Sequence, residues 1–297
     1  MKTKINLLKT FLNLKVGLEN FGVFDSKKVF CWCDGFYISV PLESGLDKTF
    51  ATNLKEFVRV ADGKDNLDFE LHEESESIKI KFKRTRFKIP SVPLENTQEE
   101  LDLSDAKSID FGNSNIFLDN LKKAEKFMAI KDIRNYLEGV SIKGSEMGAS
   151  NGCIAILIKD CGLDIGQNII IPRVAVEFLI KIKLTLKTIF FSEVNGKANR
   201  ISFQFENGEI FSSPLIDQSF PDLSSVVYIN EKLPVNELPQ EFFDALRELK
   251  AQDKGVGVRL SPTQIEIQEN VVNGTVEATV EIDLPGMIED VGFRLEY

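Results

Sequence analysis

The side chains best suited to chemistry are scattered along this chain. The only histidine, His72, lies in an acidic strand-and-turn segment with no second histidine to share a metal. Cys31 and Cys33 are separated by one residue, whereas zinc sites usually use a C-x-x-C spacing, so we interpret both as small buried apolar residues. Gly255-Val256-Gly257 lies between a predicted helix and a predicted strand, the reverse of a dinucleotide-binding loop, and is predicted to be a turn. The sequence therefore predicts no enzyme, no metal site and no cofactor.

The composition is that of an ordinary soluble globular protein. The 297 residues are enough for two or three domains, and 43% of them are hydrophobic and 28% charged. The segment MKTKINLLKTFLNLK is too interrupted by lysine for a signal peptide, and no stretch is apolar enough to span a bilayer. Four cysteines without a disulfide-like pattern favour a reducing compartment. We therefore expect a cytoplasmic protein.

The distribution of charge matters more than its sum. A formal net charge of -10 argues at first against a nucleic-acid partner. Basic residues nevertheless gather in three stretches where acids are few: Lys2, Lys4, Lys9 and Lys15; Lys122, Lys123, Lys126, Lys131 and Arg134; and Arg173, Lys181, Lys183 and Lys187. Lysines often do no more than cover solvated helix faces, but their recurrence in two related segments favours one basic surface on an acidic body. Of these residues, we take Lys9, Lys122, Lys123, Lys126, Lys181 and Lys183 as candidate DNA contacts.

The chain repeats itself at a spacing of about 120 residues, which indicates tandem domains. Asp34-Gly35 followed by a strand returns as Asn151-Gly152, and the hairpin end at 86–90 returns at 210–214. The predicted domains are residues 1–100, 114–230 and 235–297, and the third resembles only the first half of a copy.

Each full copy is predicted to be α+β. An amphipathic helix opens it, alternating strands follow, and a second helix, near 51–60 and 173–182, precedes β hairpins. The third copy is predicted to contain a helix at 242–249 and strands at 258–260, 265–267, 276–282 and 293–297. Helices with basic outer faces beside sheets suggest contact with phosphates rather than recognition of bases.

The chain resembles the bacterial β subunit of replicative DNA polymerase, the sliding clamp. The likeness is densest in FLDNLKKAEKFMAIKDIRNYLEGV, GASNGCIAIL, IIIPRVAVEFL and FSSPLIDQSFPDLSSVV, which stand in the family's order and spacing. FKRTRFKIPSVP, FFDALRELKAQDKGVGVRL and IEDVGFRLEY extend it more weakly to the other copies. The resemblance implies tandem clamp domains with helices lining an inner face and antiparallel sheets outside.

The resemblance also implies a function and its residues. It implies a processivity factor that encircles or embraces duplex DNA without reading its sequence, tethers a replicative polymerase and catalyses nothing; a clamp loader is a further possible partner. The implied DNA contacts in the second domain are Lys131, Arg134 and Tyr136. The implied partner-peptide cleft falls on Leu137, Gly152, Cys153, Pro221 and Val226. The implied contact between subunits is made by Arg86 and Phe87 on one side and by Leu249 and Lys250 on the other.

The chain departs from the family's pattern in three places. Cys153-Ile154-Ala155 replaces His-Arg-Leu, Ser225 replaces a basic residue, and the family's C-terminal cleft wall has no counterpart in the third copy. We therefore expect an altered partner motif and a head-to-tail homo-oligomer in which the third copy meets copy one. A shortened clamp of this kind suits a virus that replicates in a bacterium, in which case it would act in the host cytoplasm. A clamp-like binding or scaffold protein that never encircles DNA is the alternative.

Overall fold

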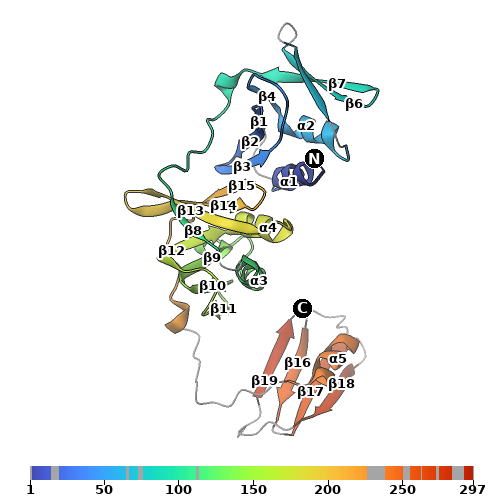
Figure 1. Ribbon diagram of the computed structural model, residues 1–297. Helices are drawn as coiled ribbons and strands as arrows, with labels where there is room; N and C mark the ends of the chain where they lie inside the picture. The colour runs from blue at the N-terminus through green and yellow to red at the C-terminus, as the bar shows by residue number, and fades with distance from the viewer. Residues whose placement is uncertain are drawn as a thin grey trace. The chain divides into compact units, whose positions relative to one another are not determined.

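The computed structural model describes residues 2–14, 20–64, 67–72, 76–111, 114–225, 238–249, 255–261, 263–271, 274–282 and 291–296. The chain forms two compact units, Met1–Val227 and Tyr228–Tyr297, coloured blue to light orange and orange to red in Figure 1. Both combine helices with antiparallel sheets, which confirms the predicted α+β class. In the part of the chain described, no helix is long and apolar enough to cross a membrane.

Unit 1 contains both full copies. The first copy consists of α1 (Lys2–Leu12), β1 (Phe21–Phe24), β2 (Lys28–Cys33), β3 (Phe36–Pro41), β4 (Phe50–Asn53), α2 (Leu54–Ala61), β5 (Asp68–His72), β6 (Ser77–Phe82) and β7 (Thr85–Val92). The connection contains η2 (Leu94–Asn96) and β8 (Lys107–Asp110). The second copy consists of α3 (Ser114–Glu125), η3 (Asn135–Glu138), β9 (Gly139–Gly144), β10 (Glu146–Ser150), β11 (Ala155–Ile158), β12 (Ile165–Pro172), α4 (Arg173–Lys181), β13 (Leu186–Val194), β14 (Lys197–Phe205), β15 (Ile210–Pro214) and η4 (Leu223–Ser225).

The second helix of copy one starts later than predicted. Residues 50–53 form β4 and pair with β1, so α2 begins at Leu54 rather than at Ala51. Asn53 fixes this start because its side-chain oxygen accepts hydrogen bonds from the N–H groups of Lys55 and Glu56. Alternation of apolar residues continues across this boundary, which is why periodicity alone placed the start too early.

The same four-stranded arrangement occurs three times. The strand order is β4-β1-β2-β3 in copy one and β12-β9-β10-β11 in copy two. Unit 2 repeats it as β19-β16-β17-β18. A helix precedes the first strand each time: α1, α3 and α5. Because the order and the direction of the strands both recur, the repeat in the sequence corresponds to a repeated arrangement of one helix and four strands.

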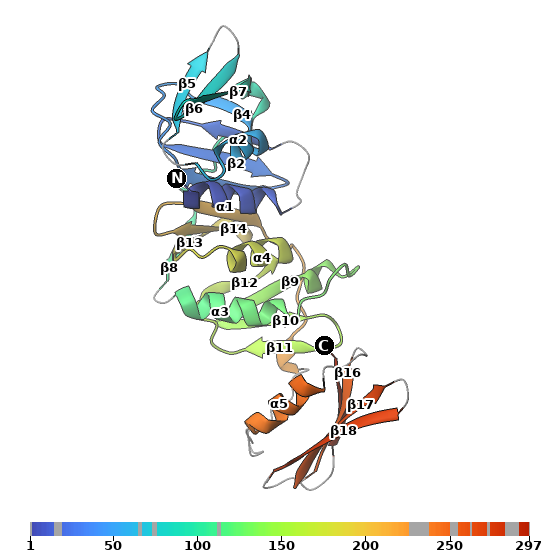
Figure 2. The ribbon, with the colours of Figure 1, turned by 90° about the vertical axis from the view of Figure 1, so that its right-hand side faces the viewer.

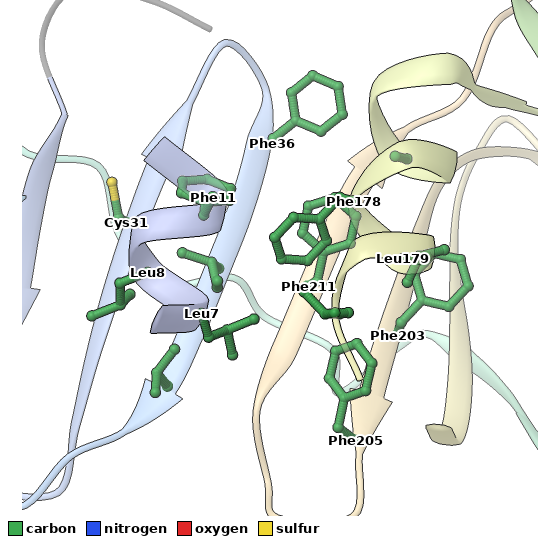
Figure 3. Packing of buried hydrophobic residues seen from close by; sticks show 14 of the residues in the cluster. Leu7, Leu8, Phe11, Cys31, Phe36, Phe178, Leu179, Phe203, Phe205 and Phe211 are labelled. Atoms are coloured by element: carbon green, nitrogen blue, oxygen red, sulfur yellow. The ribbon is translucent and has the colours of Figure 1, made fainter. Parts of the chain in front are cut away.

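The two full copies are joined through one sheet. β3 of copy one pairs with β15 of copy two, so eleven strands are continuous in the order β5-β6-β7-β4-β1-β2-β3-β15-β14-β13-β8. Behind the junction the rings of Phe178 and Phe211 lie 4.1 Å apart, and Phe11 meets both edge-on (Figure 3). Phe36 stacks on Phe211 from β3. Helices and strands of both copies therefore share one apolar core.

Unit 2 has a small core of its own. It consists of α5 (Gln240–Glu248), β16 (Gly255–Leu260), β17 (Gln264–Val271), β18 (Gly274–Glu281) and β19 (Val291–Glu296). Phe242 of α5 packs with Val256, Val258, Ile265 and Ile267 of the sheet. The predicted turn at residues 255–257 is wrong, because this segment is the start of β16 and pairs with β19. Two glycines around a valine suggested a turn, but neither has a positive φ.

The shared core predicts a large effect of one substitution. Phe211 is fully buried, and Phe211→Ala should lower the free energy of unfolding of unit 1 by about 3–5 kcal/mol because it leaves a cavity at the junction. The measurement is urea denaturation followed by fluorescence of the single tryptophan, Trp32, which lies on β2 beside β3. Ile133→Ala is the control, since Ile133 is 97% exposed and its loss should change stability by less than about 0.5 kcal/mol. Equal stability of Phe211→Ala and the parent would contradict the proposed role of the junction.

Candidate nucleic-acid interface

Four helices lie on one side of unit 1. α1 neighbours α2 and α4, and α4 neighbours α3, so the four form a continuous layer facing the viewer in Figure 2. Their apolar sides are buried by residues such as Leu8, Phe57, Phe117 and Phe178. Their polar sides therefore form the outward surface of this layer.

All six lysines predicted from the charge pattern are exposed, but several have partners within the protein. Lys9 donates to the Asp62 carboxylate at 2.6 Å. Lys181 lies 3.4 Å from the Glu177 carboxylate, one helical turn away. Lys123 donates to the side-chain oxygen of Asn120 at 3.3 Å. The two carboxylates reduce the positive charge offered to a ligand at two of the six positions, whereas the neutral amide of Asn120 leaves the charge of Lys123 intact.

Other predicted contacts keep their full charge. Lys122, Lys126, Lys131 and Lys183 are exposed, and none forms an ion pair with another residue in the described ranges. Lys122 lies on α3, Lys126 directly after it, Lys131 in the loop that follows, and Lys183 after α4. These four charges therefore lie on the α3–α4 half of the helix layer.

The segment between α3 and η3, residues Lys126–Arg134, forms a braced loop that we call the tip loop. The Arg134 guanidinium donates to both oxygens of Asp132 at 2.9 Å, and the Asp132 N–H donates to Glu138 at 2.7 Å. The Arg173 guanidinium holds the carbonyls of Met128 and Ala129 at 2.8 and 2.9 Å. Hydrogen bonds from the Arg134 side chain and backbone lower the pKa of Asp132 to about 2.

The tip loop meets the turn that carries two predicted cleft residues. Gly152 has φ +88°, a conformation that favours glycine, and a Cβ built on it would lie 2.6 Å from the Arg134 guanidinium, so a side chain there would be strained and would displace that group. Cys153 follows with an exposed thiol. The structure therefore brings Arg134 together with Gly152, which no spacing in the sequence shows.

The remaining predicted cleft residues do not line one cavity. Leu137 is buried in the core, whereas Pro221 lines a groove of about 320 Å³ together with Gly148, Leu157, Phe220 and Leu223. The predicted DNA contact Tyr136 is half-buried and lies between these features: its ring meets Phe220 edge-on, and its N–H donates to Gln218. Val226 lies outside the described residues.

The predicted subunit-contact residues lie in different units. In unit 1, Arg86 is exposed on β7, and the half-buried Phe87 ring lies 5.1 Å from the Lys64 ammonium. In unit 2, Leu249 is buried at the end of α5, and Lys250 lies outside the described residues.

Sequence analysis missed how basic the β6–β7 hairpin is. Residues 77–92 contain no acid, and Lys79 lies opposite Lys88 and Lys81 opposite Arg86. On the other side of β6, Glu70 lies opposite Lys79 and Asp68 opposite Lys81, so β5 supplies the acids that offset like charges across a strand pair. Alternation of charged and apolar residues in this segment was the available signal.

Unit 2 is strongly acidic. It contains 14 acidic and six basic residues, so most of the chain's net negative charge resides there. Its helix α5 exposes Glu241, Asp244 and Glu248, and its single base, Arg247, is bonded to Asp244 at 2.8 Å. The basic layer therefore belongs to unit 1.

The cysteines fit the interpretation drawn from their spacing at Cys31 and Cys33. Both are buried, and burial raises the pKa of each thiol, that of Cys33 to about 11. Within the described ranges, no three histidine, cysteine or acidic residues gather as metal ligands.

Comparison with solved structures identifies the fold. No family model matches the chain, and no curated protein matches it. Solved structures do: a putative DNA polymerase III β subunit from Eubacterium rectale superposes with a TM-score of 0.78 at 14% identity, covering 99% of this chain and 84% of that one. The chain has the sliding-clamp fold.

Two other sliding-clamp structures are also similar to this chain. The sliding clamp of Bacillus subtilis gives a TM-score of 0.77 at 15% identity and covers 98% of this chain and 84% of its own. The Helicobacter pylori β clamp, solved with a DNA ligase peptide, gives 0.75 at 15% identity, with 98% and 85% covered. These likenesses confirm the predicted clamp fold and its strong divergence in sequence.

The hydrogen bonds between Arg134 and Asp132, which brace the tip loop, lead to a testable prediction about pH. The lowered pKa of Asp132 means that its bonds to Arg134 are complete at neutral pH and are lost only as the pH falls through about 2. A carboxyl-detected NMR titration should give a midpoint near 2 for Asp132, and Arg134→Gln should raise it towards 3.8. Asp102 is the control, because its pKa is lowered by Ser104 and should not respond to Arg134→Gln. A midpoint near 3.8 for Asp132 in the parent would rule out the brace.

Proposed function

We propose that this protein is a DNA sliding clamp that embraces duplex DNA and holds a replicative polymerase on its template. The observation that carries the proposal is the layer of basic helices in unit 1 of a clamp fold, in which Lys122, Lys126 and Lys183 form no ion pair with any residue of the described ranges. A layer of ammonium groups on helices binds phosphates at any sequence.

The proposed ligand is duplex DNA without sequence preference. Lysine ammonium groups on flexible stems contact phosphates as point charges and carry no information about bases. The charged side chains that α3 and the residue after it offer are those of Lys122, Lys123 and Lys126, which contact phosphates at any sequence. Such a surface holds DNA by counterion release and lets it slide.

The proposed protein partner is a replicative polymerase, placed on the protein by a clamp loader. The family's peptide cleft would lie around Gly152, Cys153 and Pro221; of these three, Pro221 lines a groove together with Phe220 and Leu223. Since Cys153 stands at a position where the family has histidine, the partner peptide would differ from the family's usual one. The protein would act in the cytoplasm, catalyse nothing and need no cofactor.

The proposed assembly is a head-to-tail homo-oligomer. Within one chain, β3 of a four-stranded repeat pairs with β15. β18 holds the place of β3 in unit 2, and β7 holds the place of β15 in copy one, so β18 of one copy would pair with β7 of the next. β18 carries Glu277 and Glu281, and β7 carries Arg86 and Lys88, so acids would meet bases along this strand pair. Opposite charges support this pairing.

The acidic character of unit 2 supports a second candidate. A clamp-like protein could embrace DNA with unit 1 alone and use the exposed acids of α5 to face other proteins. Such a protein would bind DNA without encircling it.

Charge reversal on α3 tests the proposed DNA contact. Lys122→Glu, Lys123→Glu and Lys126→Glu together should abolish stimulation of processive synthesis, because six units of charge change beside the DNA. Thermal unfolding should stay unchanged, since all three side chains are exposed. The measurement is product length in a primer-extension assay.

The matched control reverses Lys27, Lys48 and Lys107, which are also exposed but lie on strands or turns, away from the groove beside Phe220. This control variant should still stimulate processive synthesis. If the α3 variant stimulates as well as this control, the helix layer is not the DNA contact.

Charge exchange tests the proposed assembly. Arg86→Glu with Lys88→Glu should raise the dissociation constant of the oligomer at least about tenfold. Adding Glu277→Lys and Glu281→Lys in the same chain should restore assembly, as measured by analytical ultracentrifugation. Lys27→Glu with Lys143→Glu serves as control and should leave assembly unchanged. If the second pair of changes weakens assembly further, β18 does not face β7.

A further inference from the structure

The tip loop presents two isoleucines to solvent. Ile130 is 74% exposed and Ile133 is 97% exposed, while Leu137 a few residues later is buried. Single exposed apolar residues are common, but two in one short loop form a feature that needs a physical reason.

The loop is not free to fold these side chains inward. Besides the Asp132–Arg134 and Arg173 bonds, Ala129 donates its N–H to the carbonyl of Leu137 at 2.9 Å. Lys131 has φ +56°, a left-handed conformation that a residue with a side chain seldom adopts. Internal bonds therefore hold a strained backbone in the one arrangement that points both isoleucines outward.

The surroundings identify the chemistry of the partner. Lys126 and Lys131 are exposed beside the isoleucines. The acids of this region are occupied: Asp132 by Arg134, and Glu138 by the backbone of Asp132. The loop thus combines apolar tips with uncompensated positive charge, which complements an anionic surface that has apolar recesses.

We infer that Ile130 and Ile133 enter a groove of the bound DNA duplex and pack against sugars and base edges while Lys126 and Lys131 contact the flanking phosphates. The inference rests on the proposed DNA-clamp function and adds to it a contact that counterions do not weaken. Proteins that bind the minor groove often insert aliphatic side chains such as isoleucine and leucine between base steps. The tip loop would keep the protein close to the duplex axis when salt weakens the lysine contacts.

The test separates apolar from ionic contacts by salt dependence. Binding of a fluorescein-labelled duplex is measured by anisotropy over a series of salt concentrations. Ile130→Ser with Ile133→Ser should weaken binding about tenfold at every salt concentration, because apolar area stays in water. The slope of log affinity against log salt should not change. Lys122→Gln with Lys126→Gln is the control and should make that slope shallower by about 1.8.

The possible outcomes distinguish a contact of the two isoleucines with DNA from a contact with a protein partner. Affinity of the double serine variant within twofold of the parent overturns the inference, and loss of polymerase stimulation with that affinity retained would assign the isoleucines to a protein partner. A changed slope in the serine variant overturns it as well. An unchanged Asp132 titration midpoint in the variant shows that the brace is intact, so that weaker binding reports the lost contact. If the parent itself fails to bind the duplex at low salt, the proposed function fails with it.

Discussion

The structure of unit 1 depends on the pairing of β3 with β15. This single junction converts two copies of a repeat into one body, and the rings of Phe11, Phe178 and Phe211 fill the space behind it. Because α1 and α4 pack against the same cluster, they cannot rotate independently. The basic sides of four helices thus lie on one side, where a single partner can touch them all.

Charge is divided unevenly between the two units. Unit 1 has the basic helix layer, and unit 2 has an excess of acids and an acidic helix. An acidic unit repels a phosphate backbone, so DNA would be confined to the layer of unit 1. In the proposed assembly the acids of unit 2 would also attract the bases of the β6–β7 hairpin, so the same division of charge would favour both the assembly and the proposed DNA contact.

Much of this fold could be predicted from the sequence because its signals are local. Alternation of apolar residues located the hairpins, and the recurrence of short segments located the copies. Long-range contacts could not be predicted in this way. The pairing of Lys9 with Asp62, and the contact of Arg134 with Gly152, join residues far apart in sequence. The exposure of Ile133 could not be predicted either, since an isoleucine four residues before the buried Leu137 would normally be expected to lie in the core.

The central claim is that the protein holds DNA by enclosing it, and topology tests this directly. The protein is assembled on a nicked circular plasmid with its loader, washed at high salt and passed over a gel-filtration column before and after the plasmid is cut once. The account predicts that the protein stays on the circle through the wash and leaves after the cut, because enclosure does not depend on counterions whereas phosphate contacts do. Loss from the intact circle at high salt, equal to the loss from cut DNA, would contradict it.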